Sequence, residues 1–392
     1  MADKKTTELT LATEVNTEVD YVLIWDTSDT DTYNSNQRAV VRDLWDRDSD
    51  FKKLTQSPSA EDGDYVLIYD TSASGYRKMT RANFYSTPAA PSSKAYISGG
   101  ACSNSAYLRV HTQLMSFSTV TFSVAVGADL SLARRTLCCL HGEGTYGWMC
   151  GGASAGGTRT NNIDKFTYAT DTAAVGASVL PEICEHSAGL TEGTTQGYSC
   201  GGASAGTSNR VNKITYATEV WTGAVAVISS ARHFLAGLNA GSTKGYIGFR
   251  YLNGDIDKLT YATDAISVVY NNQVIHTANH YVCISEGTTH GYFIGGLQAA
   301  ASIVASKLVY ATDVLTLSGS TYLVLARIGA AGVSVDASDA YIVGGSTIPT
   351  PGISDPQSIE HIDMTTDTTS AYGATVLVAT GYQPGSLSDT GF

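Results

Sequence analysis

Charged side chains and long apolar runs are both scarce in this chain. Lysine, arginine, aspartate and glutamate make up only 15% of its 392 residues, and no run of eighteen apolar residues is present that would span a membrane. The net charge of −12 argues against a nucleic-acid binder, because such a protein needs a basic face to displace counterions from phosphate. The first seven residues contain no apolar stretch typical of a secretory signal. We therefore expect synthesis in the cytoplasm, no membrane insertion and no nucleic-acid partner.

Motifs for metals and catalysis are missing as well. The seven cysteines include no C-x-x-C pair, and no histidine–cysteine spacing suits zinc. No H-E-x-x-H, G-x-S-x-G or Walker sequence is present, nor the Ser-x-Asp-x-Gly-x-Thr-Trp box of sialidase-like propellers. Cys150 and Cys200 fall at a repeat position that elsewhere holds Ser98 or Ile294, so we expect small buried side chains. The sequence thus predicts no catalytic, cofactor or metal site, and no enzyme.

Glycine and aromatic residues, in contrast, form a long-period repeat. An aromatic residue, two further residues and a glycine pair recur, with the second glycine lost in one copy. The steps between the aromatic residues are 52, 50, 48, 46 and 49 residues, a period typical of kelch-like propeller blades. The six segments begin at Tyr96, Trp148, Tyr198, Tyr246, Tyr292 and Tyr341.

Each repeat unit predicts a blade of four strands. In the unit from residue 186 the strands are centred near Ala188, Tyr198, Ile214 and Ala224. The third strand is apolar on both faces, as a blade packed between two other blades requires. The glycine pairs suit positions where backbones approach closely or adopt positive φ. Acidic residues then occupy the turn before the fourth strand, at Asp171, Glu219, Asp264, Asp313 and Asp367.

The first blade lacks its first strand, and the carboxyl end of the chain supplies a candidate for it. Residues 384–392 align with residues 188–198, beginning with Pro384 against Ala188. We therefore predict a mainly β fold, with a six-bladed kelch-like β-propeller over residues 94–392 that is closed by the C-terminal strand. Closure removes the open sheet edge that would otherwise invite aggregation.

A different duplication occupies residues 1–85. Asp20-Tyr-Val-Leu-Ile-Trp-Asp-Thr-Ser is repeated as Asp64-Tyr-Val-Leu-Ile-Tyr-Asp-Thr-Ser, and each copy ends in an Arg-x-x-aromatic sequence that would form one or two helical turns. These patterns predict two small β-rich modules, at about 6–46 and 55–85, each too small to fold alone. Residues 86–93, rich in proline and small side chains, predict a linker.

Three features of the repeat region remain as candidate sites. His276 and His280 are four residues apart, and on a strand they would be about 13 Å apart, too far to share a metal. Asp255 and Asp257 stand in the repeat that lost its glycine pair, either as ligands of a hard cation or as part of a solvated loop. The proline-rich insertion at residues 348–356 lengthens one loop, as a binding loop or as a neutral insertion.

Together with Tyr76-Arg-Lys-Met-Thr-Arg-Ala-Asn-Phe84, the amino-terminal duplication resembles the modules at the head of bacteriophage tail-fibre and other virion appendage proteins. The resemblance covers roughly residues 6–85. It implies that residues 1–85 dock on other virion proteins, that the chain forms a homo-oligomer, a trimer in such fibres, and that its place is the virion. The later repeats resemble kelch propellers but keep a tryptophan on the last strand only at Trp221, so kelch partners do not transfer with the fold.

Two hypotheses from different classes follow. The first is a structural virion appendage, on tail or head, whose propeller is displayed for binding host-surface glycan or protein. A purely architectural decoration protein without receptor binding is a variant of it. The second is a carbohydrate-active propeller enzyme, a hydrolase or an oxidase, which would need carboxylates or a metal converging at one end of the ring.

Overall fold

The computed structural model describes residues 22–25, 65–70, 75–80, 94–102, 107–142, 144–250, 253–270, 280–297, 301–317, 323–347, 358–372 and 383–388. The chain divides into two compact units, residues 1–90 and 91–392. In the described part of the chain, no helix is long and apolar enough to cross a membrane.

The first unit contains a three-stranded sheet built from the duplicated sequence. Strand β1 (Val22–Trp25) pairs antiparallel with β2 (Tyr65–Asp70), and β2 pairs with β3 (Gly75–Thr80). Because β1 and β2 are the two copies of the repeated segment, the duplication forms its own strand pair. The other residues of the predicted modules, their Arg-x-x-aromatic endings and the predicted linker at 86–93 lie outside the described residues.

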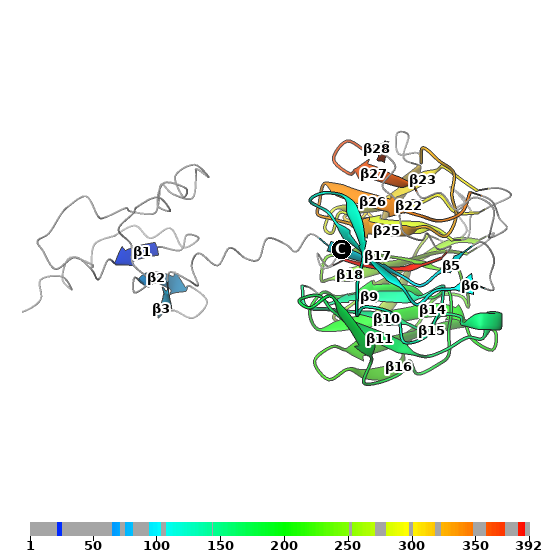
Figure 1. Ribbon diagram of the computed structural model, residues 1–392, viewed down its shortest axis with the longest axis horizontal. Helices are drawn as coiled ribbons and strands as arrows, with labels where there is room; N and C mark the ends of the chain where they lie inside the picture. The colour runs from blue at the N-terminus through cyan, green and yellow to red at the C-terminus, as the bar shows by residue number, and fades with distance from the viewer. Residues whose placement is uncertain are drawn as a thin grey trace, which may run out of the picture. The chain divides into compact units, whose positions relative to one another are not determined.

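The second unit is a six-bladed β-propeller, and each blade is a four-stranded antiparallel sheet (Figure 1). Blade 1 contains β29 (Gly385–Ser388), β4 (Lys94–Ser98), β7 (Thr112–Ser116) and β8 (Thr121–Val124); blade 2 contains β9 (Cys138–Gly142), β10 (Tyr146–Cys150), β11 (Ile163–Thr167) and β12 (Thr172–Val175); blade 3 contains β13 (Ala188–Thr191), β14 (Gln196–Ala203), β15 (Thr207–Thr215) and β16 (Val220–Val227). Blade 4 contains β17 (Ala236–Ala240), β18 (Lys244–Arg250), β19 (Asn253–Thr260) and β20 (Ala265–Tyr270); blade 5 contains β21 (Val282–Ser285), β22 (His290–Ile294), β23 (Ala305–Val309) and β24 (Val314–Leu317); blade 6 contains β25 (Ala331–Ser334), β26 (Asp339–Val343), β27 (Ile359–Asp363) and β28 (Thr368–Tyr372). A small hairpin of β5 (Ala101–Cys102) and β6 (Tyr107–Leu108) extends the loop between β4 and β7.

The C-terminal strand closes the ring, as the sequence predicts. Leu387 of β29 lies opposite Tyr96 of β4, just as Leu190 lies opposite Tyr198 in blade 3. The register places Gly385 opposite Ser98, so Gly385 rather than Pro384 takes the position of Ala188. Leu387 is fully buried in an apolar cluster that joins the first two blades. Closure therefore rests on backbone pairing and on side-chain burial.

The aromatic residue of each repeat packs between blades. Trp148 of blade 2 stacks on Tyr216, which follows the third strand of blade 3, with ring centroids 4.3 Å apart. At the junction of blades 5 and 6, Tyr292 packs in a core cluster with Met364, which takes the place of the second aromatic residue. Burial of these large side chains supplies much of the adhesion between blades. The other stacked pairs are Tyr96 with Tyr168, Tyr198 with Tyr261, Tyr246 with Tyr310, and Tyr341 with Phe117.

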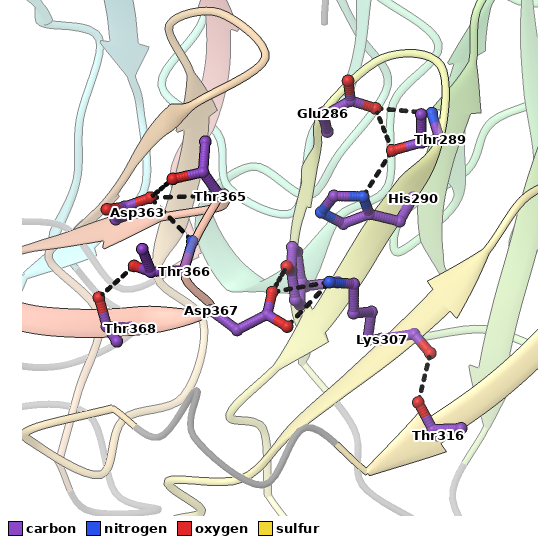
Figure 2. Close-up of polar contacts among 11 residues, drawn as sticks. Glu286, Thr289, His290, Lys307, Thr316, Asp363, Thr365, Thr366, Asp367 and Thr368 are labelled. Atoms are coloured by element: carbon purple, nitrogen blue, oxygen red, sulfur yellow. Dashed lines mark hydrogen bonds and ion pairs between the residues drawn. The ribbon is translucent and has the colours of Figure 1, made fainter.

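The acidic turn residues form polar contacts that also join neighbouring blades. In Figure 2, Lys307 of blade 5 reaches the Asp367 carboxylate of blade 6, with Nζ 2.8 Å from each oxygen. The Tyr292 hydroxyl donates to the same carboxylate. All five acidic turn residues have φ between 52° and 56°, so the predicted turns are confirmed. The equivalent position of blade 1 is Val120, and the junction of blades 6 and 1 is an apolar cluster.

The glycine pairs have the conformation that the sequence predicts. Their φ values lie between 61° and 104°, a region that favours glycine. A Cβ placed on Gly99 would lie 2.4 Å from the carbonyl oxygen of Arg134 in the next blade, so a side chain is also excluded by close approach. The amide of Gly100 donates to that same carbonyl at 2.9 Å. The glycine pairs thus bring the blades that carry them against the segment that enters the next blade.

The propeller has two different ends. The hairpin end carries the turn between strands three and four of every blade and the turn between strands one and two of blades 2 to 6, and the loop end carries the other connections. Strand β4 begins at the hairpin end with Lys94, whose Nζ lies 3.0 Å from the Asp171 carboxylate. Because β29 is antiparallel to β4, it ends at the same end with Ser388. The first and last described strands of this closing blade, β4 at Lys94 and β29 at Ser388, therefore begin and end at the hairpin end.

Candidate functional site

At the loop end, six equivalent residues surround the propeller axis immediately before the innermost strands. We call them the axial collar. All six have φ between 55° and 60°, although only one is glycine. Their backbones hydrogen-bond from blade to blade: the amide of His186 donates to the carbonyl of Thr136, and the amide of Gly329 donates to that of His280. The collar consists of Thr136, His186, Phe234, His280, Gly329 and Gln383.

Rings gather on one side of the collar. The Phe234 ring lies 4.0 Å from His186 and 4.4 Å from both His233 and His280, measured between centroids. The His186 and His280 rings are 5.6 Å apart, and the Gln383 amide is hydrogen-bonded to the His280 ring. Side chains from four blades thus meet at the axis, although His186, Phe234, His280 and Gln383 are separated in turn by 48, 46 and 103 residues in the sequence.

Burial and nearby positive charge keep the collar histidines neutral. Burial lowers the pKa of His280 to about 4, with the charge of Arg135 as the next cause. Burial also holds the pKa of His186 well below its usual value, assisted by the charges of His280, His233, Arg135 and Arg159. The collar histidines are therefore unprotonated at neutral pH, where each ring offers one donor and one acceptor.

Two arginines beside the collar differ in their partners. The Nε of Arg159 lies 2.8 Å from the Glu185 carboxylate, whose other oxygen is 3.6 Å from His186. Arg135 precedes collar residue Thr136 and pairs through its backbone with Ala153. Within the described ranges, the Arg135 guanidinium has no carboxylate at ion-pair distance.

Beneath the collar the innermost strands line a cavity of about 180 Å³. Deeper along the axis, polar residues form a second ring through hydrogen bonds between blades. The Thr191 hydroxyl donates to the His141 carbonyl at 2.6 Å, and the Ser388 amide donates to His141 Nδ1 at 3.0 Å. Burial lowers the pKa of His141, which fits a neutral ring that accepts this bond. The second ring contains His141, Thr191, Asn239, Ser285, Ser334 and Ser388.

The two acidic candidates from the sequence have a different role from either predicted one. Asp255 and Asp257 lie in strand β19 and are 9% and 0% exposed, so the solvated-loop alternative is wrong. Asp257 forms a buried ion pair with Arg232, and Asp255 lies 3.6 Å from the same guanidinium. Both carboxylates therefore lie against the Arg232 guanidinium, and the structure gives them the role of partners of a buried arginine. Residues two apart in a strand share one face, and here that face is buried. Pairing with Arg232 offsets the energetic cost of burying the carboxylates.

The remaining candidates are only partly described. His276 and the insertion at 348–356 lie outside the described residues. His280 precedes β21 with a left-handed backbone, so it does not lie on the strand assumed for the His276–His280 pair. Cys150 and Cys200 are fully buried free thiols, as predicted. In the described ranges, no three His, Cys, Asp or Glu side chains are placed to hold a metal ion.

Sequence reasoning missed the collar and the buried arginines. The arginines had a signal: the dipeptide Ala-Arg recurs before the innermost strand of alternate blades, at 133–134, 231–232 and 326–327. The collar had a weaker signal in the sequence. The residue type at the collar position differs from blade to blade, whereas equivalent positions in the strands keep similar residue types.

No family model matches this chain, and no curated protein matches it either.

Proposed function

We propose that this chain is a structural virion appendage protein of a bacteriophage, whose first unit docks on the particle and whose propeller binds the host surface through its loop end. The observation that carries the proposal is the position of the chain connections. Lys94 and Ser388 both lie at the hairpin end of the ring. The chain enters the propeller from the first unit at Lys94, so a particle that holds the first unit would be connected to the propeller through the hairpin end.

Two further features support this role. Residues 6–85 resemble the modules at the head of phage tail-fibre proteins, and their duplicated segments pair in one sheet through β1 and β2. The propeller resembles kelch repeats, and its variable residues converge on the axis at the loop end. Binding residues in rigid scaffolds concentrate on loops at one end of the fold, which matches this distribution. We further propose that the first unit assembles the chain into a trimer.

The experiment uses the purified full chain and the particle that carries it. Host cells are incubated with the full chain, and particles left unattached are then counted. We expect the chain to reduce attachment in proportion to its concentration, and a heat-unfolded sample to have no effect. Antibody labelling in electron microscopy should locate the chain on the particle. Labelled particles whose attachment is not reduced would make the chain an architectural decoration, and particles without label would rule out a virion role.

A further inference from the structure

The exposed apolar side chains of the propeller gather on its outer rim. The first strand of each blade lies innermost and the fourth outermost, so the rim consists of β8, β12, β16, β20, β24 and β28. Among the described residues, every exposed large apolar side chain except Ile303 lies on a fourth strand or on the segment that follows it. None lies in a described turn of the hairpin end. Apolar side chains concentrated in one region of a surface mark a site of interaction.

The rim strands also lack charge. The six fourth strands contain no lysine, arginine, aspartate, glutamate or proline. Outer strands of soluble proteins usually carry such residues, which prevent pairing with another chain. Two copies of a chain with a net charge of −12 repel each other, and this repulsion is least where both surfaces are uncharged. The rim therefore fits a second copy of this chain, whereas a basic partner would gain nothing from it.

Exposure is greatest where the rims of blades 1 and 2 meet. Val126 is 89% exposed and Val175 is 70% exposed, more than any other large apolar side chain in the described ranges. Val126 follows β8 of blade 1, and Val175 ends β12 of blade 2. The Ala173 amide donates to the Gly127 carbonyl at 2.9 Å, so the two rims are joined here. We call Val126, Val175 and the 47% exposed Val124 of β8 the rim patch.

The rim patch belongs in part to the blade that the chain enters first. Strand β4 of blade 1 begins at Lys94, and residues 81–93 separate it from β3. A chain of that length spans at most about 50 Å. Copies joined through their first units therefore keep the entry points of their propellers close together. The inference rests on the trimer of the proposed function.

A threefold arrangement uses two neighbouring blades of each ring. Six blades are spaced by about 60° around the propeller axis. Three rings with parallel axes around a shared threefold axis each touch two neighbours, in directions that are also about 60° apart. One blade then faces one neighbour, and the next blade faces the other. We infer that the three propellers of the trimer contact each other through the rim patch, with Val124 and Val126 of one copy against Val175 of the next.

The contact does not need a large area. A few valine side chains bury too little surface to hold separate chains together. Joined first units raise the effective concentration of a neighbouring rim into the millimolar range, where a weak contact forms. The first units thus hold the trimer, and the rim patch sets how its propellers are arranged.

Chemical crosslinking of the full chain tests this contact. The double variant Val126→Cys with Val175→Cys is treated with a short bismaleimide and separated on a denaturing gel, and the unaltered chain gives the background from native cysteines. We expect covalent dimers and trimers, because each copy offers one new cysteine to each neighbour. Val126→Cys with Leu317→Cys is the control pair, since Leu317 is 53% exposed on blade 5, across the ring from blade 2. Its yield of covalent trimer should be about tenfold lower or less.

A charge placed in the contact gives a second test. Adding Val124→Asp to the first cysteine pair should lower the trimer yield about tenfold, because the contact would bury an unpaired carboxylate. Val314→Asp, at a rim position of blade 5 that is 43% exposed, should leave the yield unchanged. Thermal melting shows that each variant folds, and sedimentation shows whether it is still a trimer.

Sedimentation also separates this inference from the proposed function. A trimer without crosslinks between rims, or with equal yields from the two cysteine pairs, would overturn the inference and leave the proposed trimer intact. Covalent dimers without trimers would indicate a twofold contact and also overturn it. A monomeric chain would remove the trimer and the inference together. Crosslinked trimers of a chain that antibody labelling does not find on the particle would support the inference, and the proposed virion role would fall.

Discussion

Arg134 and Asp164 form a buried ion pair, with side chains that are 0% and 1% exposed. The same pair recurs in alternate blades, as Arg232 with Asp257 and as Arg327 with Glu360. In blade 3 the equivalent positions hold Cys184 and Asn212, both uncharged. Positive and negative charge are therefore present together or absent together, which is the arrangement that a buried site requires.

Removing one member of this pair should cost far more than replacing both. Asp164→Asn leaves the Arg134 guanidinium buried without a carboxylate, and we expect a loss of about 3–5 kcal/mol in the free energy of unfolding. The double variant Arg134→Cys with Asp164→Asn copies the residues of blade 3 and should recover part of that loss. Denaturant unfolding of the single and double variants measures the coupling. Losses that simply add would show that the two charges do not depend on each other.

Because β29 closes the ring, truncating one of its buried side chains near the end of the chain should strongly lower stability. Leu387 is fully buried between the first two blades, so Leu387→Ala should lower stability by about 2–5 kcal/mol. Leu325→Ala, at a site that is 38% exposed, is the control and should have a much smaller effect. Deletion of residues 383–392 should lower the melting temperature further than either. A truncated chain that melts within a degree or two of the intact one would contradict closure.

The polar contacts between blades should weaken in acid. Burial alone would raise the pKa of Asp313, but hydrogen bonds from Lys258 and Tyr246 lower it overall. A carboxyl whose pKa is lower in the folded state stabilises the fold above its unfolded value of about 3.9 and loses that contribution as the pH falls through the folded value. Melting between pH 5 and pH 2.5 should therefore show a smaller acid-induced drop for Asp313→Asn than for the unaltered chain. An identical drop would show that this contact adds no stability.

The collar histidines should set the pH dependence at milder acidity. Burial and Arg135 lower the pKa of His280 to about 4, so the folded state binds its proton less readily than the unfolded chain. Stability from this residue is complete above about pH 6.5 and decreases by up to about 1.4 kcal/mol per pH unit down to about pH 4. His280→Gln should flatten the stability profile in this window. A profile that keeps its slope would mean that His280 is not the group responsible.

The fold was predictable because its determinants are local and repeated. The aromatic and glycine positions recur about every fifty residues, and each repeat forms the same strand and, except in blade 4, the same left-handed glycine pair, as at Gly99 and Gly100. The predicted alignment of the C-terminal residues, with Pro384 against Ala188, was wrong by one position. A strand of only four residues carries too few characteristic side chains to fix its alignment from sequence. The register was fixed by Leu387, which fills the space beside Tyr96.

The site was not predictable for two physical reasons. From the sequence, Asp257 was interpreted as a cation ligand or as part of a solvated loop, because its partner Arg232 stands 25 residues earlier, in the segment leading into the blade. The collar depends on a left-handed backbone at His186 and Phe234, which no propensity favours and which hydrogen bonds around the closed ring impose. Both features arise only once the blades are assembled.

The orientation of the propeller on the intact particle tests the central claim most directly. Cryo-electron microscopy at a resolution that separates the blades would show which end of the ring faces outward. We predict that Lys94 and Ser388 face the particle and that the collar around Phe234 faces the surrounding medium. A collar turned toward the particle, or covered by another virion protein, would contradict the proposed function.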